Sequence, residues 1–189
     1  MTFSAVLLVG GKSERMGEDK ATILFRDRPL WKIQLDLLRK LQPVELFVSA
    51  RNDPPWRPPD VRFVRDEEPS RGPLSGIAAT LSQITTDHLL ALAIDMPLMT
   101  ESYLRGLYEK VDGNRGVVPL IENRAEPLAA IYPRRADVDF AEALASNNYS
   151  LQPVVAKLVA AGKLQPVQAS LEDQARFRNL NEPADLERS

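Results

Sequence analysis

Short apolar runs alternate with longer amphipathic stretches along this chain. Strand-like runs lie at 3–9, 44–50, 61–66 and 88–94. Continuously apolar runs of this length are typical of parallel strands buried on both faces, and 61–66 alternates as a shorter strand would. The run at 88–94 is the most apolar of the four, which predicts the central strand of a sheet.

The stretches between these runs carry helix signals. Residues 29–41 begin with a proline and place Leu30, Ile33, Leu37 and Leu41 on one face. Further helices are expected at 70–84 after a Gly-Pro turn, at 100–111 with Thr100 as N-cap, at 136–145, and at 152–162 with Gly162 as its end. Two strands around a turn are expected at 116–121 and 127–133, and a strand, a turn and a short helix at 176–189.

This order of elements predicts an α/β fold with three α/β/α layers and a mostly parallel, Rossmann-like sheet. No repeat or linker-like segment interrupts it, so we expect a single domain over residues 1–189. Ligands of such sheets bind beyond the carboxyl ends of the strands. The candidate positions therefore follow the apolar runs: residue 10 onward, 49–52, 66 onward, and 95.

The composition narrows the range of partners and reactions that this protein can have. The 189 residues are 44% hydrophobic and 26% charged, with a formal net charge of −2, which argues against nucleic acid or an anionic membrane as a partner. The absence of cysteine excludes disulfides and thiolate chemistry. No apolar run is long enough to span a bilayer and no basic segment precedes the first one, so a cytoplasmic protein is expected. The single histidine, His88, reads as a strand-entry residue.

The stretch VLLVGGKSERMGEDK at 6–20 places two glycines directly after the first predicted strand. Its GKS is not the end of a Walker loop, because that motif would need glycine where Val6 stands. Two adjacent glycines can nevertheless aim backbone N–H groups at one oxyanion, and Arg15 and Lys20 would add positive charge. A glycine turn in a solvated, charged loop is the alternative interpretation.

The same stretch resembles the signature L-A-G-G-x-S-x-R-M-G-x-D-K of the nucleotidyltransferase family with a glycosyltransferase-A-like fold. The resemblance implies that Leu8, Val9, Gly10 and Gly11 wrap a nucleoside triphosphate. It also implies that Arg15 and Lys20 are catalytic and face the phosphates, whereas Lys12 occupies a variable position. Val9 stands where the family usually has alanine.

A second element, RDEEPSRGPLSGI at 65–77, resembles the G-P-L-x-G-[IM] segment of the molybdenum cofactor guanylyltransferase branch of that family. The resemblance implies nucleotide contacts from Gly72, Pro73 and Leu74, and a base site lined by the strand-end residues Leu8, Ser49 and Asp66. An aspartate acceptor suits guanine, whose N1–H and amino group are both donors. Read alone, the segment is a helix start with suitable turn residues.

Asp95 directly follows the most apolar run and precedes Pro97. By position it would either bind Mg²⁺ or cap a turn. The resemblance to the D-x-P motif implies that Asp95 is catalytic and binds both metal and nucleotide.

Two later segments also resemble the family. The segment NLNEPADL at 179–186 resembles its closing segment and offers Asn181 as a second metal-ligand candidate. Residues 124–133 resemble the segment that lines the acceptor side, with Glu126 where glutamine is common.

The resemblance extends from Val6 to Leu186. It implies transfer of GMP from GTP to the phosphate of molybdopterin with Mg²⁺, which releases pyrophosphate and forms the guanine dinucleotide molybdenum cofactor. Transient contact with molybdoenzymes or their chaperones would follow from such a product. Two alternatives stay open: a cytidylyl- or sugar-phosphate nucleotidyltransferase of the same superfamily, and a nucleotide-binding module without turnover.

Overall fold

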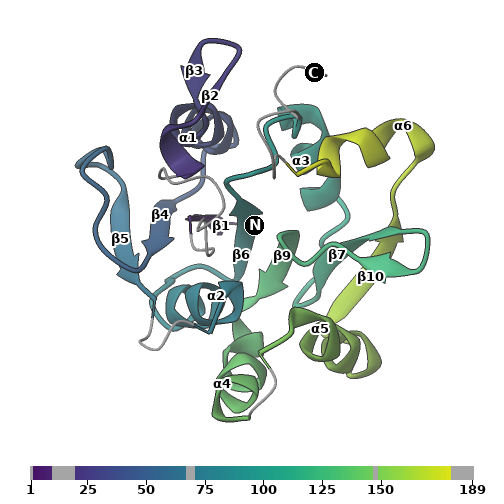
Figure 1. The fold of residues 1–189 in the computed structure, drawn as a ribbon. Helices are drawn as coiled ribbons and strands as arrows, with labels where there is room; N and C mark the ends of the chain where they lie inside the picture. Colours follow the sequence, from purple (N-terminus) through teal and green to yellow (C-terminus); the bar gives the residue numbers. More distant parts are fainter. Residues whose placement is uncertain (1, 10–19, 67–70, 147–148, 180–189) are drawn as a thin grey trace.

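A central sheet with helices on both faces forms the described part of the protein (Figure 1). The computed structural model describes residues 2–9, 20–66, 71–146 and 149–179. In these residues the sheet has eight strands in the order β10-β7-β9-β6-β1-β4-β5, with β8 paired to β7. Their bounds are β1 Phe3–Leu8, β4 Glu45–Ala50, β5 Arg62–Arg65, β6 His88–Ala93, β7 Gly116–Ile121, β8 Arg124–Ala125, β9 Ala129–Pro133 and β10 Leu164–Gln168.

The centre of the sheet is parallel, as the apolar runs predict. β1 pairs in parallel with both β4 and β6, and Leu8 lies opposite Ser49 on one side and Ala93 on the other. β5 continues this parallel arrangement on β4. β9 runs antiparallel to β6 and β7, and β8 to β7, but the other pairings of this sheet are parallel, including that of β10 with β7. The prediction of a mostly parallel sheet is therefore confirmed.

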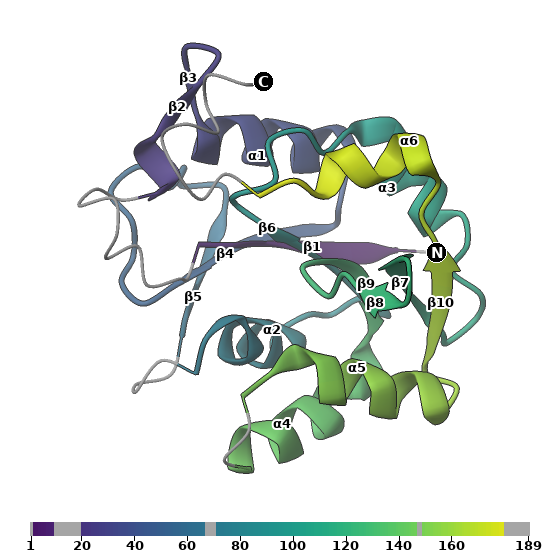
Figure 2. The same cartoon turned by 45° about the vertical axis from the view of Figure 1, so that its right-hand side comes forward.

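Two helical layers cover the sheet (Figures 1 and 2). One layer contains α1 (Leu30–Lys40), α3 (Glu101–Tyr108) and α6 (Leu171–Gln174), and the other contains α2 (Pro73–Leu81), α4 (Asp137–Ala145) and α5 (Leu151–Ala160). Successive strand side chains point to opposite faces, so Leu7 joins the first hydrophobic core and Leu8 the second. The expected three-layer α/β/α architecture is thereby confirmed. No helix in the described ranges is both long and apolar enough to cross a membrane.

The structure confirms the predicted capping residues at two helix ends. The Thr100 hydroxyl accepts a hydrogen bond from the Tyr103 backbone N–H at 3.4 Å, which confirms it as the N-cap of α3. Gly162 lies just beyond α5 with φ at +65°, a left-handed conformation that favours glycine.

The connection from β4 to β5 contains no helix in residues 51–61, all of which are described. Trp56 in this proline-dense segment stacks on Trp31 of α1, with ring centroids 5.3 Å apart and planes 14° apart. The Arg57 guanidinium pairs with Asp53 and donates to the Val61 carbonyl oxygen. These contacts hold the crossover together and fasten it to α1 without a helix of its own.

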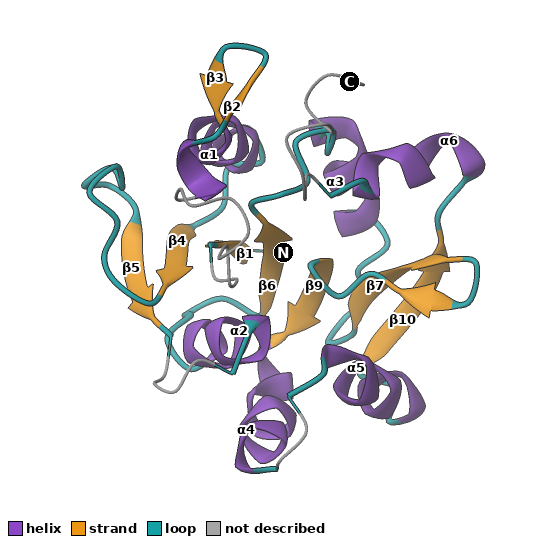
Figure 3. Cartoon of the chain, in the orientation of Figure 1, coloured by secondary structure: helices purple, strands orange, loops and turns teal. Residues whose placement is uncertain are grey.

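Several elements differ from the expectations (Figure 3). Three strand features were not predicted: the hairpin of β2 (Leu24–Phe25) and β3 (Arg28–Pro29), the edge strand β10, and β8, which lies inside the expected turn. The sequence also did not predict the short 3-10 turns η1 (Lys20–Thr22) and η2 (Arg134–Ala136). The expected strand at 176 onward is wrong at its start, because α6 continues into the 3-10 turn η3 (Ala175–Phe177). Ser170 caps α6 by accepting a hydrogen bond from the Asp173 N–H at 3.2 Å, which favours the helical path.

His88 is the first residue of β6 and is fully buried, as expected of a strand-entry residue. It lies opposite Phe3, at the amino end of the parallel strands. Burial lowers the pKa of its imidazole, an effect that the Arg115 backbone and the Asp87 carboxylate partly oppose.

The lowered pKa of His88 predicts a loss of stability in mild acid. The unfolded chain takes up the imidazole proton near its ordinary pKa of about 6.5, before the folded chain does, so the free energy of unfolding falls as the pH drops through that value. Denaturant titrations between pH 7.5 and 5 would measure this, and His88→Leu should flatten the slope. A His88 ring signal that titrates at or above the ordinary pKa in NMR spectra would contradict the prediction.

Candidate functional site

The predicted site residues that the structure describes gather at the carboxyl edge of the parallel strands. Leu8 is the last residue of β1, and Ser49 is the second-last residue of β4. Asp66 comes directly after β5, and Asp95 comes shortly after β6. Backbone hydrogen bonds tie this edge together, because the Val9 N–H donates to the Ser49 carbonyl at 2.9 Å and the Ile94 N–H donates to the Leu8 carbonyl at 3.1 Å. Gly10, Gly11, Arg15 and Asn181 lie outside the described residues, as does Lys12.

Lys20 and Asp95 form an ion pair across this edge. The Lys20 Nζ lies 2.9 Å from Asp95 Oδ2, and the two side chains are only 20% and 19% exposed. Lys20 opens the 3-10 turn η1, whose next residue, Ala21, is fully buried in the core. Two residues 75 positions apart are therefore brought together by packing that the sequence does not display locally.

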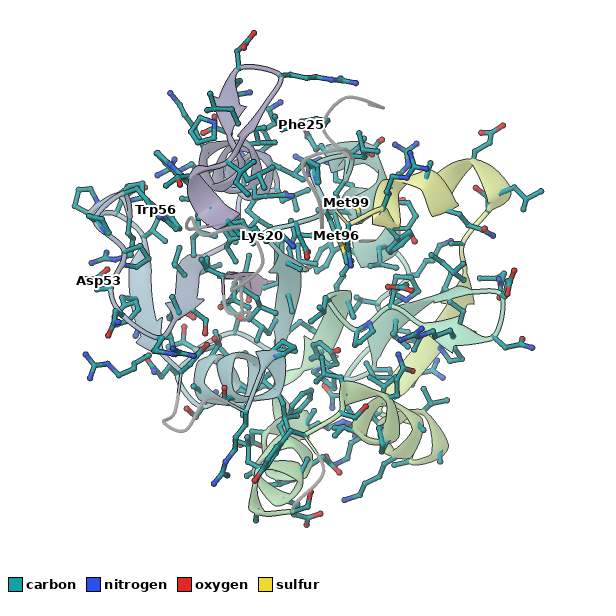
Figure 4. The ribbon with its side chains drawn as sticks, viewed as in Figure 1. Lys20, Phe25, Asp53, Trp56, Met96 and Met99 are labelled. Carbon is teal, nitrogen blue, oxygen red and sulfur yellow. The ribbon has the colours of Figure 1, made fainter. Side chains whose placement is uncertain are left out.

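The turn after β6 fixes the position of Asp95. The Met99 N–H donates to the Met96 carbonyl at 3.1 Å, and both methionine side chains are buried (Figure 4). Asp95 Oδ1 is buried and has no hydrogen-bond partner among the described residues. A buried carboxylate oxygen without a donor is a suitable ligand for a hard cation.

Ser49 and Asp66 form a second polar pair, on the α2 side of the same edge. The Ser49 hydroxyl donates to Asp66 Oδ1, and both residues are almost fully buried. Burial raises the pKa of the Asp66 carboxyl, and the Ser49 hydrogen bond and the Arg51 cation oppose that effect. Ser49 thus orients the carboxylate and leaves it able to accept hydrogen bonds from a donor group at this edge.

Gly72 and Gly76 of the Gly-Pro-Leu-Ser-Gly segment have different structural roles. Gly72 has φ at +68° and precedes α2, with Pro73 at the first helical position and Leu74 fully buried, so the turn itself requires glycine there. Gly76 is the residue in close contact with the site. A Cβ on Gly76 would lie 2.6 Å from Ser49 Oγ, 3.0 Å from Leu8 Cδ2 and 3.1 Å from Asp66 Oδ1.

Glu126 lies on the loop between β8 and β9 and is partly buried. The Ala93 N–H donates to the Leu128 carbonyl at 2.9 Å, so this loop packs beside the strand that leads to Asp95. Burial raises the pKa of Glu126, and Arg124 opposes this. A raised pKa reduces the charge that Glu126 presents in mildly acidic solution.

A parallel sheet with polar groups converging beyond its strand ends is typical of nucleotide-binding α/β proteins. A family model described as a MobA-like NTP transferase domain matches residues 5–167. The class is therefore that of the nucleotidyltransferases. The chain belongs to the MobA-like NTP transferase family.

Curated relatives match almost the whole chain. A protein from Opitutus terrae named "Probable molybdenum cofactor guanylyltransferase" is 31% identical over 188 residues, which cover 98% of this chain and 93% of that protein. A protein of the same name from Methanothermobacter thermautotrophicus is 32% identical and covers 97% of this chain and 96% of its own length.

Solved structures share the fold. Molybdopterin-guanine dinucleotide biosynthesis protein A from Archaeoglobus fulgidus has a TM-score of 0.74 at 20% identity, over 98% of this chain and 95% of that one. 4-Diphosphocytidyl-2C-methyl-D-erythritol synthase from Anaerococcus prevotii has a TM-score of 0.72 at 14% identity, over 98% and 93%. The fold is thus common to proteins whose names refer to different bases.

We predict that Gly76→Ala destabilises the protein. The added methyl group would collide with Ser49 Oγ inside a packed edge, and such overpacking costs about 1–3 kcal/mol in the free energy of unfolding. Gly106→Ala is the matched control. A methyl group on Gly106, in α3, would have no atom of a neighbouring element within 4 Å, and alanine favours a helix by about 1 kcal/mol over glycine. Equal stability of the two variants in urea titrations would show that the contact is not restrictive.

Proposed function

We propose that this protein transfers GMP from GTP to the phosphate of molybdopterin, releasing pyrophosphate and forming the guanine dinucleotide molybdenum cofactor. The observation that carries the proposal is that one sheet edge presents two polar pairs, Ser49–Asp66 and Lys20–Asp95. We assign the first pair to the base and the second to the phosphates. The names of the full-length relatives support the same assignment. We further propose that the chain acts as one domain, and that its product is handed to molybdoenzymes or their chaperones.

Asp66 is the proposed reader of the base. Its carboxylate accepts hydrogen bonds, and guanine presents the N1–H and the 2-amino group as adjacent donors. Ser49 occupies Oδ1 as a donor and so restricts the rotation of the carboxylate. Cytosine has no comparable pair of adjacent ring and amino donors, which favours the guanylyl assignment over the cytidylyl one.

Asp95 is the proposed metal-binding residue. Its buried Oδ1, which has no partner in the described ranges, fits Mg²⁺, a cation that prefers oxygen ligands and one or two carboxylates together with phosphates. Asn181 is the proposed second ligand. A bound Mg²⁺ would supply positive charge to the phosphate oxygens during transfer.

In the proposed reaction, an oxygen of the molybdopterin phosphate attacks the α-phosphorus of GTP. The new P–O bond forms as the bond from the α-phosphorus to the bridging oxygen breaks, and pyrophosphate leaves. Lys20 and Arg15 would stabilise the charge on the pyrophosphate, and the amides of Gly10 and Gly11 would hold the triphosphate in line. The acceptor phosphate is already ionised, so no general base is required.

Nucleotide preference tests the base assignment. With Mg²⁺ present, we expect GTP to bind more tightly than CTP, UTP or ATP. Inosine triphosphate, which lacks the 2-amino group, should bind about tenfold to a hundredfold more weakly than GTP, because one hydrogen bond to a charged acceptor is lost. Calorimetric titration would measure these affinities. A clear preference for CTP or UTP would favour a cytidylyl- or sugar-phosphate nucleotidyltransferase instead.

Substitutions in the phosphate-side pair test the catalytic assignment. Lys20→Ala and Asp95→Ala should each lower kcat by about a hundredfold or more with the fold intact, because each removes charge stabilisation from the reacting phosphates. Lys12→Ala is the control from the same sequence stretch, 6–20, and should change kcat little. Steady-state kinetics and circular dichroism would check both points. A silent Lys20→Ala together with a damaging Lys12→Ala would overturn the assignment of the loop.

A further inference from the structure

The Lys20–Asp95 ion pair joins two groups that the proposed reaction uses separately. Lys20 would face the phosphates of the nucleotide, whereas Asp95 would bind the metal. In the structure, however, the ammonium lies 2.9 Å from Asp95 Oδ2, with about four-fifths of each side chain out of water. The attraction between charges is stronger at such a site than on an exposed surface, where water screens it.

The charges of this pair disfavour a second cation. Asp95 supplies one negative charge, and the Lys20 ammonium already balances it at hydrogen-bond distance. A divalent ion on Oδ1 would share the same carboxylate with that ammonium, and the two cations would repel each other across a partly buried site. A nucleoside triphosphate brings several negative charges, which attract both cations and relieve this repulsion.

We propose that Lys20 acts as a cation placeholder on Asp95: it suppresses binding of a divalent ion in the nucleotide-free protein and releases the carboxylate when phosphates draw the ammonium away. This inference rests on the proposed function for the role of a metal at Asp95. It adds an order of assembly, in which the metal binds tightly only together with the triphosphate. Futile occupation of the site by a divalent ion without nucleotide is thereby reduced.

The position of Lys20 in the fold suits a side chain that changes partner. The backbone directly after Lys20 is held in place, because Ala21 is buried in the core and the Ile23 carbonyl accepts a hydrogen bond from the Leu30 N–H at 3.0 Å. The long side chain can therefore move its ammonium group by rotation about its own bonds while the main chain stays in place.

Binding of Mn²⁺ to the nucleotide-free protein tests the proposal. Mn²⁺ is a spectroscopic substitute for Mg²⁺, and free Mn²⁺ can be measured by electron paramagnetic resonance. We expect weak binding to the wild-type protein and about tenfold tighter binding to Lys20→Met, which corresponds to a gain of about 1.4 kcal/mol. Methionine keeps an unbranched apolar stem at this position. Adding Asp95→Asn to Lys20→Met should abolish the gain.

Two further variants separate a placeholder from a general charge effect. Lys32→Met removes the same charge from an exposed position on α1, the helix that follows the segment containing Lys20, and should leave Mn²⁺ affinity unchanged. Lys20→Arg keeps a cation at the site and should keep the affinity low. Equal Mn²⁺ affinity in wild type and Lys20→Met, or an equal gain in Lys32→Met, would overturn the proposal. These titrations contain no nucleotide, so they can fail while the transfer of GMP is still observed.

Discussion

The parallel pairing of β1 with β4 on one side and β6 on the other is the constraint on which the rest of the site depends. This pairing aligns Leu8 with Ser49 and Ala93, so the chain leaves these strands at the same edge. β5 adds Asp66 through its parallel register with β4. Three strand ends that are distant in sequence therefore deliver Ser49, Asp66 and Asp95 to one edge, and Lys20 joins them through its ion pair with Asp95. The buried apolar strands provide the energy for this arrangement, because none of the polar contacts at the edge is strong enough to hold it alone.

The two polar pairs at this edge differ in their surroundings, and the difference matches what each would bind. Ser49 and Asp66 are almost fully buried on the α2 side, where Gly76 allows the helix to approach closely. A buried acceptor suits a flat base with defined donors. Lys20 and Asp95 remain about one-fifth exposed and carry opposite full charges. A pair of that kind suits mobile, hydrated groups such as phosphates and a divalent ion, which must enter and leave.

Much of the fold could be predicted because the central strands are buried on both faces and therefore appear as apolar runs. The strand β10 escaped prediction, since it lies at an edge of the sheet and contains Pro166 between Gln165 and Val167. The helix after Ser170 had a visible signal, a serine followed three positions later by Asp173, but no helix was predicted there. For the site, strand ends predicted Ser49, Asp66 and Asp95 as neighbours. The pairing of Lys20 with Asp95 and the close packing of Gly76 on Ser49 depend on tertiary contacts that no local pattern contains.

Base reading, phosphate stabilisation and metal binding are all assigned to one sheet edge, and the acceptor supplies the nucleophile. The central claim is that this edge joins GMP to molybdopterin. The most direct measurement follows pyrophosphate released from GTP labelled at its γ-phosphorus, with Mg²⁺, in the presence and absence of molybdopterin. We predict release only when molybdopterin is added, together with an equimolar amount of the guanine dinucleotide. Release that does not depend on molybdopterin, or no release in its presence, would contradict the claim.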